Sequence, residues 1–264
     1  MTKIVFSDVD GTLLDSNRHI TPLTLDAIKK LEKNNIPFVI TSGRGPTGIY
    51  PILDEYGFNC PIIAYGGALI MDKNRKILFN TGFSKSDALE IVSFLNNENL
   101  DLSWGVYSLN QWIVKDKSDP RIINEERIIN AQSSEGDINS VESDIVNKIL
   151  CICDSSDIDE FVTILRNRFS EHSIVKSSDT LIEVMKKGIT KATAIDKLCS
   201  IWNIKKENTI AFGDNYNDIE MLEYVEKPFL MSNAPDGMKK IITSYTEDND
   251  HDGIHHALKR LKLI

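Results

Sequence analysis

Residues 4–14 read Ile-Val-Phe-Ser-Asp-Val-Asp-Gly-Thr-Leu-Leu, and this stretch decides the fold class. The apolar run at 4–6 predicts a buried strand, and Gly11 predicts the turn that ends it. Asp8 and Asp10 therefore stand at the carboxyl end of a strand, where open α/β sheets bind ligands. Because alternate residues of a strand share a face, we expect both side chains to point the same way. Two such carboxylates repel each other, so we expect an oxygen-preferring ion such as Mg²⁺ between them, although an Asp-rich turn is the alternative.

The composition is that of a globular protein with one large domain or two modest ones. The 264 residues are 41% hydrophobic and 26% charged, with a formal net charge of −9. This acidic balance disfavours a nucleic-acid partner, and the apolar runs are too short for a membrane span. Residues 1–3 lead straight into the first predicted strand, so we expect no secretory leader and a cytoplasmic location. We expect a monomer or a weak homo-oligomer.

The cysteines predict buried free thiols in a reducing compartment rather than a metal or redox site. They form no Cys-x-x-Cys pair, and two of them alternate within a strand-like segment. The four are Cys60, Cys151, Cys153 and Cys199.

Strand and helix patterns alternate in the first and last thirds of the chain. This alternation predicts an α/β fold whose core is a Rossmann-like, doubly wound parallel sheet. The predicted elements are a strand over 4–6, a helix over 22–34, strands over 36–40 and 61–65, a helix over 191–202, strands over 209–212 and 228–231, and a short C-terminal helix.

The pattern changes after Gly82, where pairs of strands are interleaved with helices. We expect residues 83–184 to form an inserted α+β domain with helices on one face of its sheet, and residues 1–82 and 185–264 to form the core. The predicted elements are a helix over 86–97, strands over 102–107 and 111–114, a helix over 120–129, a loop over 132–140, a strand over 146–153, a helix over 158–169 and a hairpin of 173–175 with 181–185.

Polar residues follow several predicted strands of the core. Ser42 and Gly43 come after the second strand, and they offer a hydroxyl and an unobstructed N–H to a phosphoryl oxygen. Asp214 and Asp218 follow the late strand, where a helix N-terminus would favour negative charge. Because the carboxyl ends of parallel strands share one edge, we expect four carboxylates to converge there around a metal ion.

Lys191 is the remaining candidate cation, since it would begin the helix that follows a glycine turn. From local sequence alone, a solvated surface lysine is the preferred interpretation.

These motifs, taken in order, resemble the haloacid dehalogenase superfamily of phosphohydrolases, in its Cof-type branch with a large α/β cap. The resemblance covers essentially the whole chain. One departure is Gly66 where the branch usually has asparagine, which leaves the substrate contacts of that position open. The matching segments are Asp8-Val-Asp-Gly-Thr-Leu-Leu14, Ile40-Thr-Ser-Gly-Arg44, Lys187-Gly-Ile-Thr-Lys191, Gly213-Asp-Asn-Tyr-Asn-Asp218, Met231-Ser-Asn-Ala234 and Asp252-Gly-Ile254.

The resemblance implies an Mg²⁺-dependent phosphomonoester hydrolase that works through an aspartyl-phosphate intermediate. Asp8 would be nucleophile and metal ligand, and Asp10 would be the acid and base that also binds the metal through its backbone carbonyl. Asp214 would be a direct metal ligand, and Asp218 would hold a coordinated water. The expected phosphate-binding residues are Ser42, Gly43, Lys191, Asn217 and Asn233, with Arg44 as a possible substrate contact.

The expected partner is a small phosphorylated metabolite, with sugar phosphates as the leading class, and the insert is expected to close over it as a lid. Two alternatives stay open. A phosphomutase of the phosphomannomutase type would need cap arginines for a second phosphate, and the four arginines of the insert form no compelling cluster. A non-enzymatic phospho-acceptor regulator would also place an acceptor aspartate and an acidic metal pair on a sheet edge.

Overall fold

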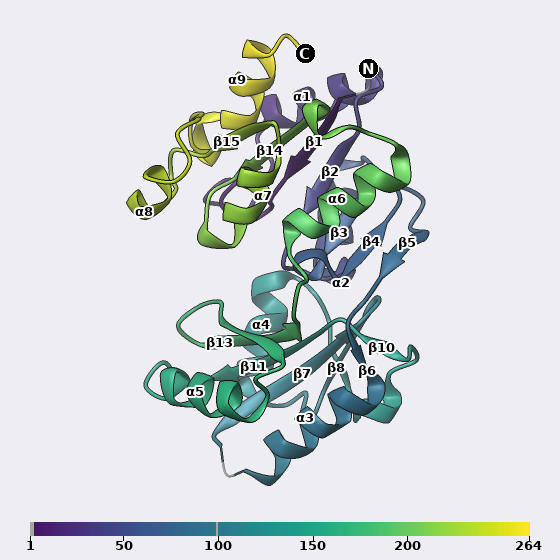
Figure 1. Ribbon diagram of the computed structural model, residues 1–264, viewed down its shortest axis with the longest axis vertical. Helices are drawn as coiled ribbons and strands as arrows, with labels where there is room; N and C mark the ends of the chain where they lie inside the picture. Colours follow the sequence, from purple (N-terminus) through teal and green to yellow (C-terminus); the bar gives the residue numbers. More distant parts are fainter. Residues whose placement is uncertain (1–2, 99) are drawn as a thin grey trace. The chain divides into compact units, whose positions relative to one another are not determined.

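The computed structural model describes residues 3–98 and 100–264 (Figure 1). Met1 and Thr2, on which the expected absence of a leader partly rests, lie outside the described residues. The chain divides into two compact units. The first comprises the chain up to Gly43 together with Ile52–Leu78 and Thr190–Ile264, and the second comprises Arg44–Pro51 and Phe79–Ile189. The segment Arg44–Pro51 therefore groups with the second unit, although it lies within the range 1–82 predicted for the core.

The first unit is built on a seven-stranded sheet of order β15-β14-β1-β2-β3-β4-β5. Its centre is parallel, because β1 pairs in parallel with both β14 and β2, and β14 pairs in parallel with β15. The strands are β1 (Ile4–Ser7), β2 (Phe38–Thr41), β3 (Ile62–Ala64), β4 (Leu69–Met71), β5 (Ile77–Asn80), β14 (Thr209–Gly213) and β15 (Lys227–Leu230).

The predicted parallel sheet is confirmed from β15 to β3, but β4 runs antiparallel to β3. Only the short segment 65–68 joins these two strands, which is enough for a hairpin and far too short for the crossover that a parallel pair requires. β4 and β5 were not predicted, since each is only three or four residues long and lies among polar turn residues.

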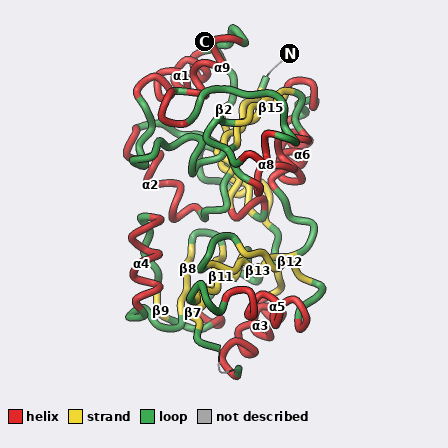
Figure 2. The backbone as a smooth tube through the Cα atoms, turned by 90° about the vertical axis from the view of Figure 1, so that its left-hand side faces the viewer, coloured by secondary structure: helices red, strands yellow, loops and turns green. Residues whose placement is uncertain are grey.

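Helices cover both faces of this sheet (Figure 2). α1 packs against α9, whereas α6 packs against α7, β3 and the turn after β3. Thr21 caps α1 by accepting a hydrogen bond from the Thr24 amide, as its position before Pro22 predicts. The helices with at least part of their length in this unit are α1 (Pro22–Lys33), α2 (Pro46–Tyr56), α6 (Lys191–Trp202), α7 (Ile219–Tyr224), α8 (Asp236–Lys239) and α9 (Gly253–Arg260).

The second unit contains a six-stranded sheet of order β12-β13-β11-β7-β8-β9. The side chains of α3 and α5 share one apolar core with this sheet, so these two helices cover the same face. The elements are β6 (Phe83–Ser84), α3 (Lys85–Asn97), β7 (Leu102–Ser108), β8 (Gln111–Val114), α4 (Pro120–Ile129), β9 (Ser134–Glu135), β10 (Ile145–Val146), β11 (Lys148–Cys153), α5 (Ile158–Arg168), β12 (His172–Lys176) and β13 (Leu181–Lys186).

Two details of this unit differ from the sequence-based prediction. The segment predicted as a loop over 132–140 contains β9, which pairs in parallel with β8, and a short 3₁₀ helix. The strand predicted over 146–153 is split at Asn147, and its first part, β10, pairs with β6 instead of joining the large sheet. Both features involve strands of two residues, which are too short to leave an alternating apolar pattern.

All four cysteines are buried and unpaired, as predicted. In the part of the chain that the structure describes, no helix is long and apolar enough to cross a membrane.

Candidate active site

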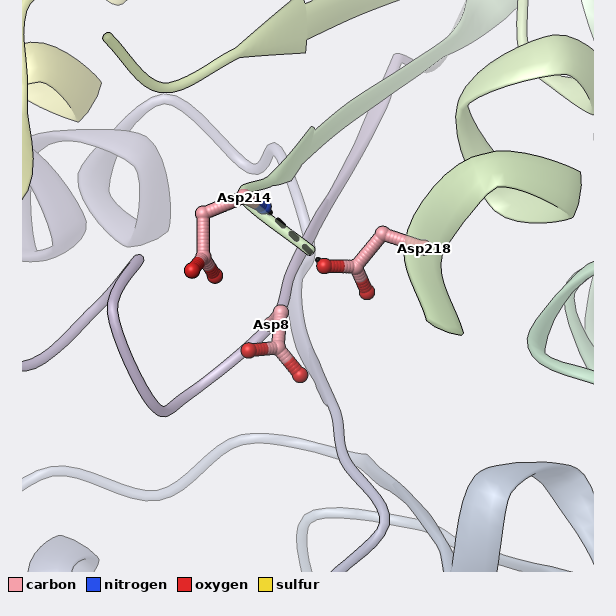
Figure 3. Close-up of side chains that lie close together, drawn as sticks. All are labelled: Asp8, Asp214 and Asp218. Carbon is pink, nitrogen blue, oxygen red and sulfur yellow. Dashed lines mark hydrogen bonds between the residues drawn. The ribbon is translucent and has the colours of Figure 1, made fainter. Parts of the chain in front are cut away.

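The carboxyl ends of β1 and β14 bring two aspartates together. These strands are in register, with Ser7 opposite Phe212, and the amide of Asp8 donates to the Phe212 carbonyl at 3.0 Å. Asp8 thus follows β1 and Asp214 follows β14 at the same edge of the sheet. Asp218 joins them from the end of a short 3₁₀ turn, and oxygens of the three carboxylates lie within 4.8 Å of one another (Figure 3).

The Asp218 side chain is held by the backbone of the same motif. Its Oδ2 accepts hydrogen bonds from the amides of Asp214 at 3.0 Å and Asn215 at 3.1 Å, and the first of these is drawn in Figure 3. A Cβ at Gly213 would overlap this carboxylate, which explains the glycine before Asp214. The spacing of four residues between the two aspartates therefore gives a folded-back loop with a fully buried carboxylate.

Lys191 places its ammonium between two of the carboxylates. It is the first residue of α6, whose N-terminus is capped by the Thr190 side chain, and only 3% of its surface is exposed. Its Nζ lies 2.5 Å from Oδ1 of Asp8 and 2.5 Å from Oδ1 of Asp218. Burial by itself favours the neutral amine, but Asp218 and Asp8 outweigh it and raise the pKa of Lys191, so the side chain stays charged. The surface position preferred from local sequence is wrong.

Negative charge remains in excess at this edge. Three buried carboxylates face one ammonium, and the Asp214 carboxylate accepts a 2.8 Å hydrogen bond from the Thr12 hydroxyl. Burial raises the pKa of Asp214 to about 6, with Asp218 adding to the effect. Burial also raises the pKa of Asp8, against the opposing charge of Lys191. Oxygen donors with uncompensated charge fit a hard divalent cation, which would favour the ionised carboxylates.

The side chain of Asp10 does not belong to this buried group. β1 ends at Ser7, so the alternation expected from a strand does not extend to Asp8 and Asp10. Asp10 is exposed and forms an isolated bridge with Leu14, whereas Asp8 is buried. Its charge still contributes to the raised pKa of Asp214, although it is the weakest of the causes. Three carboxylates therefore converge around the expected metal position, rather than the four predicted.

Ser42 and Gly43 follow β2 on the same sheet, as predicted. Ser42 is buried, and its amide donates to the carbonyl of Ile63 at 2.9 Å. Gly43 has open space where a Cβ would stand. Arg44 belongs to the second compact unit, where one guanidinium nitrogen donates to the carbonyl of Gly48 at 3.3 Å.

The two expected asparagines are exposed. Asn217 lies in the turn between Asp214 and Asp218. Asn233 donates from its side-chain amide to the carbonyl of Gly11 at 2.9 Å, so it contacts the loop that carries Asp8 and Asp10.

Thr12 and Gly11 are structural parts of the site, although the sequence pattern assigned Gly11 only a turn and Thr12 no role. Gly11 has φ +79, and a Cβ there would collide with the Asp214 carboxylate. Thr12 supplies the hydroxyl that Asp214 accepts. The signal was their presence in the Asp-x-Asp-Gly-Thr motif, but their common partner lies far along the chain, beyond the reach of any local pattern.

Comparisons with known proteins show the family of the chain. The family model of haloacid dehalogenase-like hydrolases matches residues 5–258. A Haemophilus influenzae protein described as a candidate phosphatase is 35% identical over 254 residues, which span 96% of each chain. A 5-amino-6-(5-phospho-D-ribitylamino)uracil phosphatase of Bacillus subtilis is 25% identical over 263 residues, covering 97% of this chain and 96% of that protein. The crystal structure of a Thermotoga maritima protein aligns with a TM-score of 0.88 at 27% identity, covering 98% and 97% of the two chains.

Proposed function

Because the chain belongs to the haloacid dehalogenase-like hydrolases and is a phosphatase of that family, we propose that it hydrolyses a small phosphomonoester, using Mg²⁺ and an aspartyl-phosphate intermediate. One observation carries this proposal, namely the three buried carboxylates that converge with the ammonium of Lys191 at one sheet edge. A buried cluster with this excess of negative charge is costly unless a cation occupies it.

The residues that would hold Mg²⁺ are the carboxylates of Asp8 and Asp214 and the backbone carbonyl of Asp10, with Asp218 holding a coordinated water. The contacts of Asp218 support this indirect role, because both of its oxygens already accept hydrogen bonds, from Lys191 and from backbone amides. When bound, the ion would neutralise charge on the phosphoryl oxygens and keep Asp8 ionised.

The proposed reaction has two steps. The Asp8 carboxylate attacks phosphorus, the bond to the substrate alcohol breaks, and Asp10 gives its proton to the departing oxygen. Asp10 then takes a proton from a water molecule, whose oxygen attacks the phosphorus and releases inorganic phosphate and Asp8. The exposure of Asp10 suits these transfers, since its side chain can meet both the leaving group and water.

The transferring phosphoryl group carries negative charge that the site must counter. We assign this task to Lys191, the Ser42 hydroxyl and the Gly43 amide. Lys191 has three N–H donors, and two of them point at Asp8 and Asp218, so the third suits a phosphoryl oxygen. Asn217 and Asn233 are further candidates. Both are exposed, and the side-chain amide of Asn233 already donates to the Gly11 carbonyl.

The second compact unit is proposed to act as a cap that excludes water and selects the substrate. Sugar phosphates and related polyol phosphates are the proposed substrate class. The Bacillus subtilis relative is named for a phosphorylated ribityl compound, which supports a polyol phosphate over a phosphorylated protein.

Three of the four arginines within 83–184 give the phosphomutase alternative no support. Arg121 is bound by Asp119 and Asp101, Arg166 donates to the carbonyl of Ile174, and Arg168 pairs with Glu90. These three side chains make structural contacts and do not converge on a site for a second phosphate.

The test is hydrolysis of p-nitrophenyl phosphate by the purified protein. We expect Mg²⁺-dependent release of inorganic phosphate and its loss in Asp8→Asn, and undiminished activity of Asp8→Asn or in excess chelator would refute the mechanism. With a sugar phosphate as substrate, an isomerised sugar phosphate as product would indicate a mutase. A phosphorylated form of the protein that is stable for minutes would indicate a regulator. A panel of phosphorylated metabolites would then identify the substrate.

A further inference from the structure

A turn with unusual backbone geometry lies at the carboxyl end of β3. Tyr65, Gly66 and Gly67 have φ values of +53, +60 and +124, so three consecutive residues lie in the left-handed half of conformational space. Tyr65 carries a large side chain in this conformation, and that side chain is fully buried. Such a backbone costs free energy and persists only where its surroundings impose it, often beside a functional site.

The first contact of this turn is with Ser42. The Gly66 amide donates to the Ser42 carbonyl at 2.9 Å, and the Ser42 amide donates to the carbonyl of Ile63 at 2.9 Å. β3 and the turn that follows it therefore hold Ser42 on both sides. The hydroxyl proposed to bind phosphate is presented from a fixed backbone.

The second contact is with the N-terminus of α6. A Cβ at Gly67 would overlap the carbonyl oxygen and carbon of Thr190, and it would stand 3.2 Å from the Cβ of Ala194. Thr190 caps α6, and Lys191 is the next residue. The obstructing atoms belong to the backbone, so a side chain at position 67 can fit only if the start of α6 moves. Closely packed protein interiors resist such shifts.

We propose that the Tyr65–Gly67 turn is the positioning element of this active site. Gly67 determines the position of the Lys191 ammonium through its contact with the backbone of Thr190. The inference rests on the proposed function, since it depends on the roles assigned to Lys191 and Ser42. It adds a residue that touches no substrate and acts through the helix start against which it packs.

Gly67→Ala tests the inference, and Gly57→Ala is its matched control. Gly57 also has a positive φ, +65, and open space where a Cβ would stand, so alanine there meets a disfavoured backbone conformation, milder than that at φ +124, without the collision. A displacement of about 1 Å in a catalytic group can cost on the order of 10²-fold in rate. We expect Gly67→Ala to lower kcat for p-nitrophenyl phosphate by about that factor with little change in KM, and Gly57→Ala to keep both. Equal kcat values for the two variants would overturn the proposal.

A second pair of variants tests the role of the start of α6 if Gly67→Ala fails to fold. Thr190→Ala removes the cap of α6, and Thr21→Ala removes the equivalent cap of α1. Each variant loses the hydrogen bond from a helix amide to the threonine hydroxyl, and Thr21→Ala also loses the bond from that hydroxyl to Asp252, but only Thr190 precedes a proposed active-site residue. We expect a reduced kcat in Thr190→Ala alone, and a kcat equal to that of Thr21→Ala would contradict the role of the helix start.

Lys191→Met separates failure of this inference from failure of the proposed function. Binding of orthovanadate in the presence of Mg²⁺ is measured by calorimetry for wild type, Gly67→Ala, Lys191→Met and the double variant. If Gly67 acts through Lys191, the loss of affinity caused by Gly67→Ala disappears in the Lys191→Met background. The same loss in both backgrounds would overturn the inference alone. Full activity of Lys191→Met would overturn the role proposed for Lys191, and the inference with it.

Discussion

Lys191 donates from its Nζ to Oδ1 of Asp218 across 2.5 Å, in surroundings where the Asp218 side chain has no exposed surface. The other oxygen of Asp218 accepts from the amide of Asp214. A single carboxylate thus links the ammonium proposed to bind phosphate to the loop that carries a proposed metal ligand. Its charge should matter for both stability and catalysis.

Asp218→Asn removes this charge while keeping an oxygen for the backbone amides. Breaking a buried ion pair costs roughly 3–5 kcal/mol, and because Lys191 keeps Asp8 we expect a loss near the lower end, about 3 kcal/mol. We expect kcat to fall by about 10²-fold, since the ammonium loses one of its two anchors. Urea unfolding and phosphate release measure the two effects.

The matched control for this variant is Asp236→Asn. Asp236 also pairs with a lysine, Lys239 at 3.3 Å, but its side chain is 95% exposed. An exposed pair of this kind contributes about 1 kcal/mol or less, and Asp236 lies outside the buried carboxylate group. Equal losses of stability and kcat in the Asp218 and Asp236 variants would show that burial does not strengthen the ion pair of Lys191 and Asp218.

Thr12 should tune the metal site through Asp214. Its hydroxyl donates to the Asp214 carboxylate at 2.8 Å in a buried position. A hydrogen bond to a charged group contributes about 1.5–3 kcal/mol, so Thr12→Val should raise the Mg²⁺ concentration for half-maximal activity by about tenfold or more. Titration of activity with Mg²⁺ measures this shift. Thr12→Ser retains the hydroxyl and should stay near wild type, and an equal shift in both variants would exclude the hydrogen bond as the cause.

The central part of the fold was predictable because it depends on local patterns. The buried strands β1 and β14 are apolar runs that end in polar residues, and α1 carries its cap at Thr21. The hairpin of β3 and β4 escaped prediction because its turn was interpreted only as the end of a strand. Gly66 and Gly67 adopt positive φ values readily, but the positive φ of Tyr65 and the close approach of Gly67 to Thr190 have no signal in the local sequence.

The positions of the site residues were predictable only as far as sheet topology determines them. Parallel strands bring Asp8 and Asp214 to one edge, and this follows from the strand pattern. The burial of Lys191 depends on the packing of α6 against β3 and the turn that follows it, and the exposure of Asp10 depends on β1 ending at Ser7. Both are tertiary features, and neither leaves a periodic signal in the sequence.

Without metal, stability should fall with rising pH because of Asp214. Burial raises the pKa of Asp214 from 3.8 to about 6, so the folded state keeps a proton that the unfolded state releases. Its contribution to stability is complete below about pH 4 and is lost as the pH rises through 6. The pKa shift corresponds to about 3 kcal/mol. In chelator, the difference in free energy of unfolding between Asp214→Asn and wild type should therefore grow by about 3 kcal/mol, in favour of the variant, between about pH 4 and 7.

Urea unfolding at several pH values measures this difference, and Asp236→Asn, with its exposed side chain, is the control whose pH dependence should match wild type. Added Mg²⁺ should stabilise wild type at about pH 7 and leave Asp214→Asn nearly unaffected, since a ligand stabilises only the state that binds it. Parallel pH curves for wild type and Asp214→Asn would show that the buried carboxyl does not hold its proton.

Asn147 should be a major source of stability in the second unit. Its side chain is fully buried, its Nδ2 donates to Oδ1 of Asn80 at 2.7 Å and to the carbonyl of Thr81 at 3.0 Å, and its Oδ1 accepts from the amide of Leu109 at 2.8 Å. Asn147→Ala removes three hydrogen bonds between a fully buried side chain and half-buried partners. Each such bond contributes about 1 kcal/mol, so we expect a loss of about 2–4 kcal/mol in urea unfolding followed by tryptophan fluorescence. Asn139→Ala, at an exposed position of the same unit, should change stability by less than about 0.5 kcal/mol. Similar losses in the two variants would mean that water readily replaces the contacts of Asn147. Asn147 would then not hold the end of β5 and Thr81 to the turn between β7 and β8.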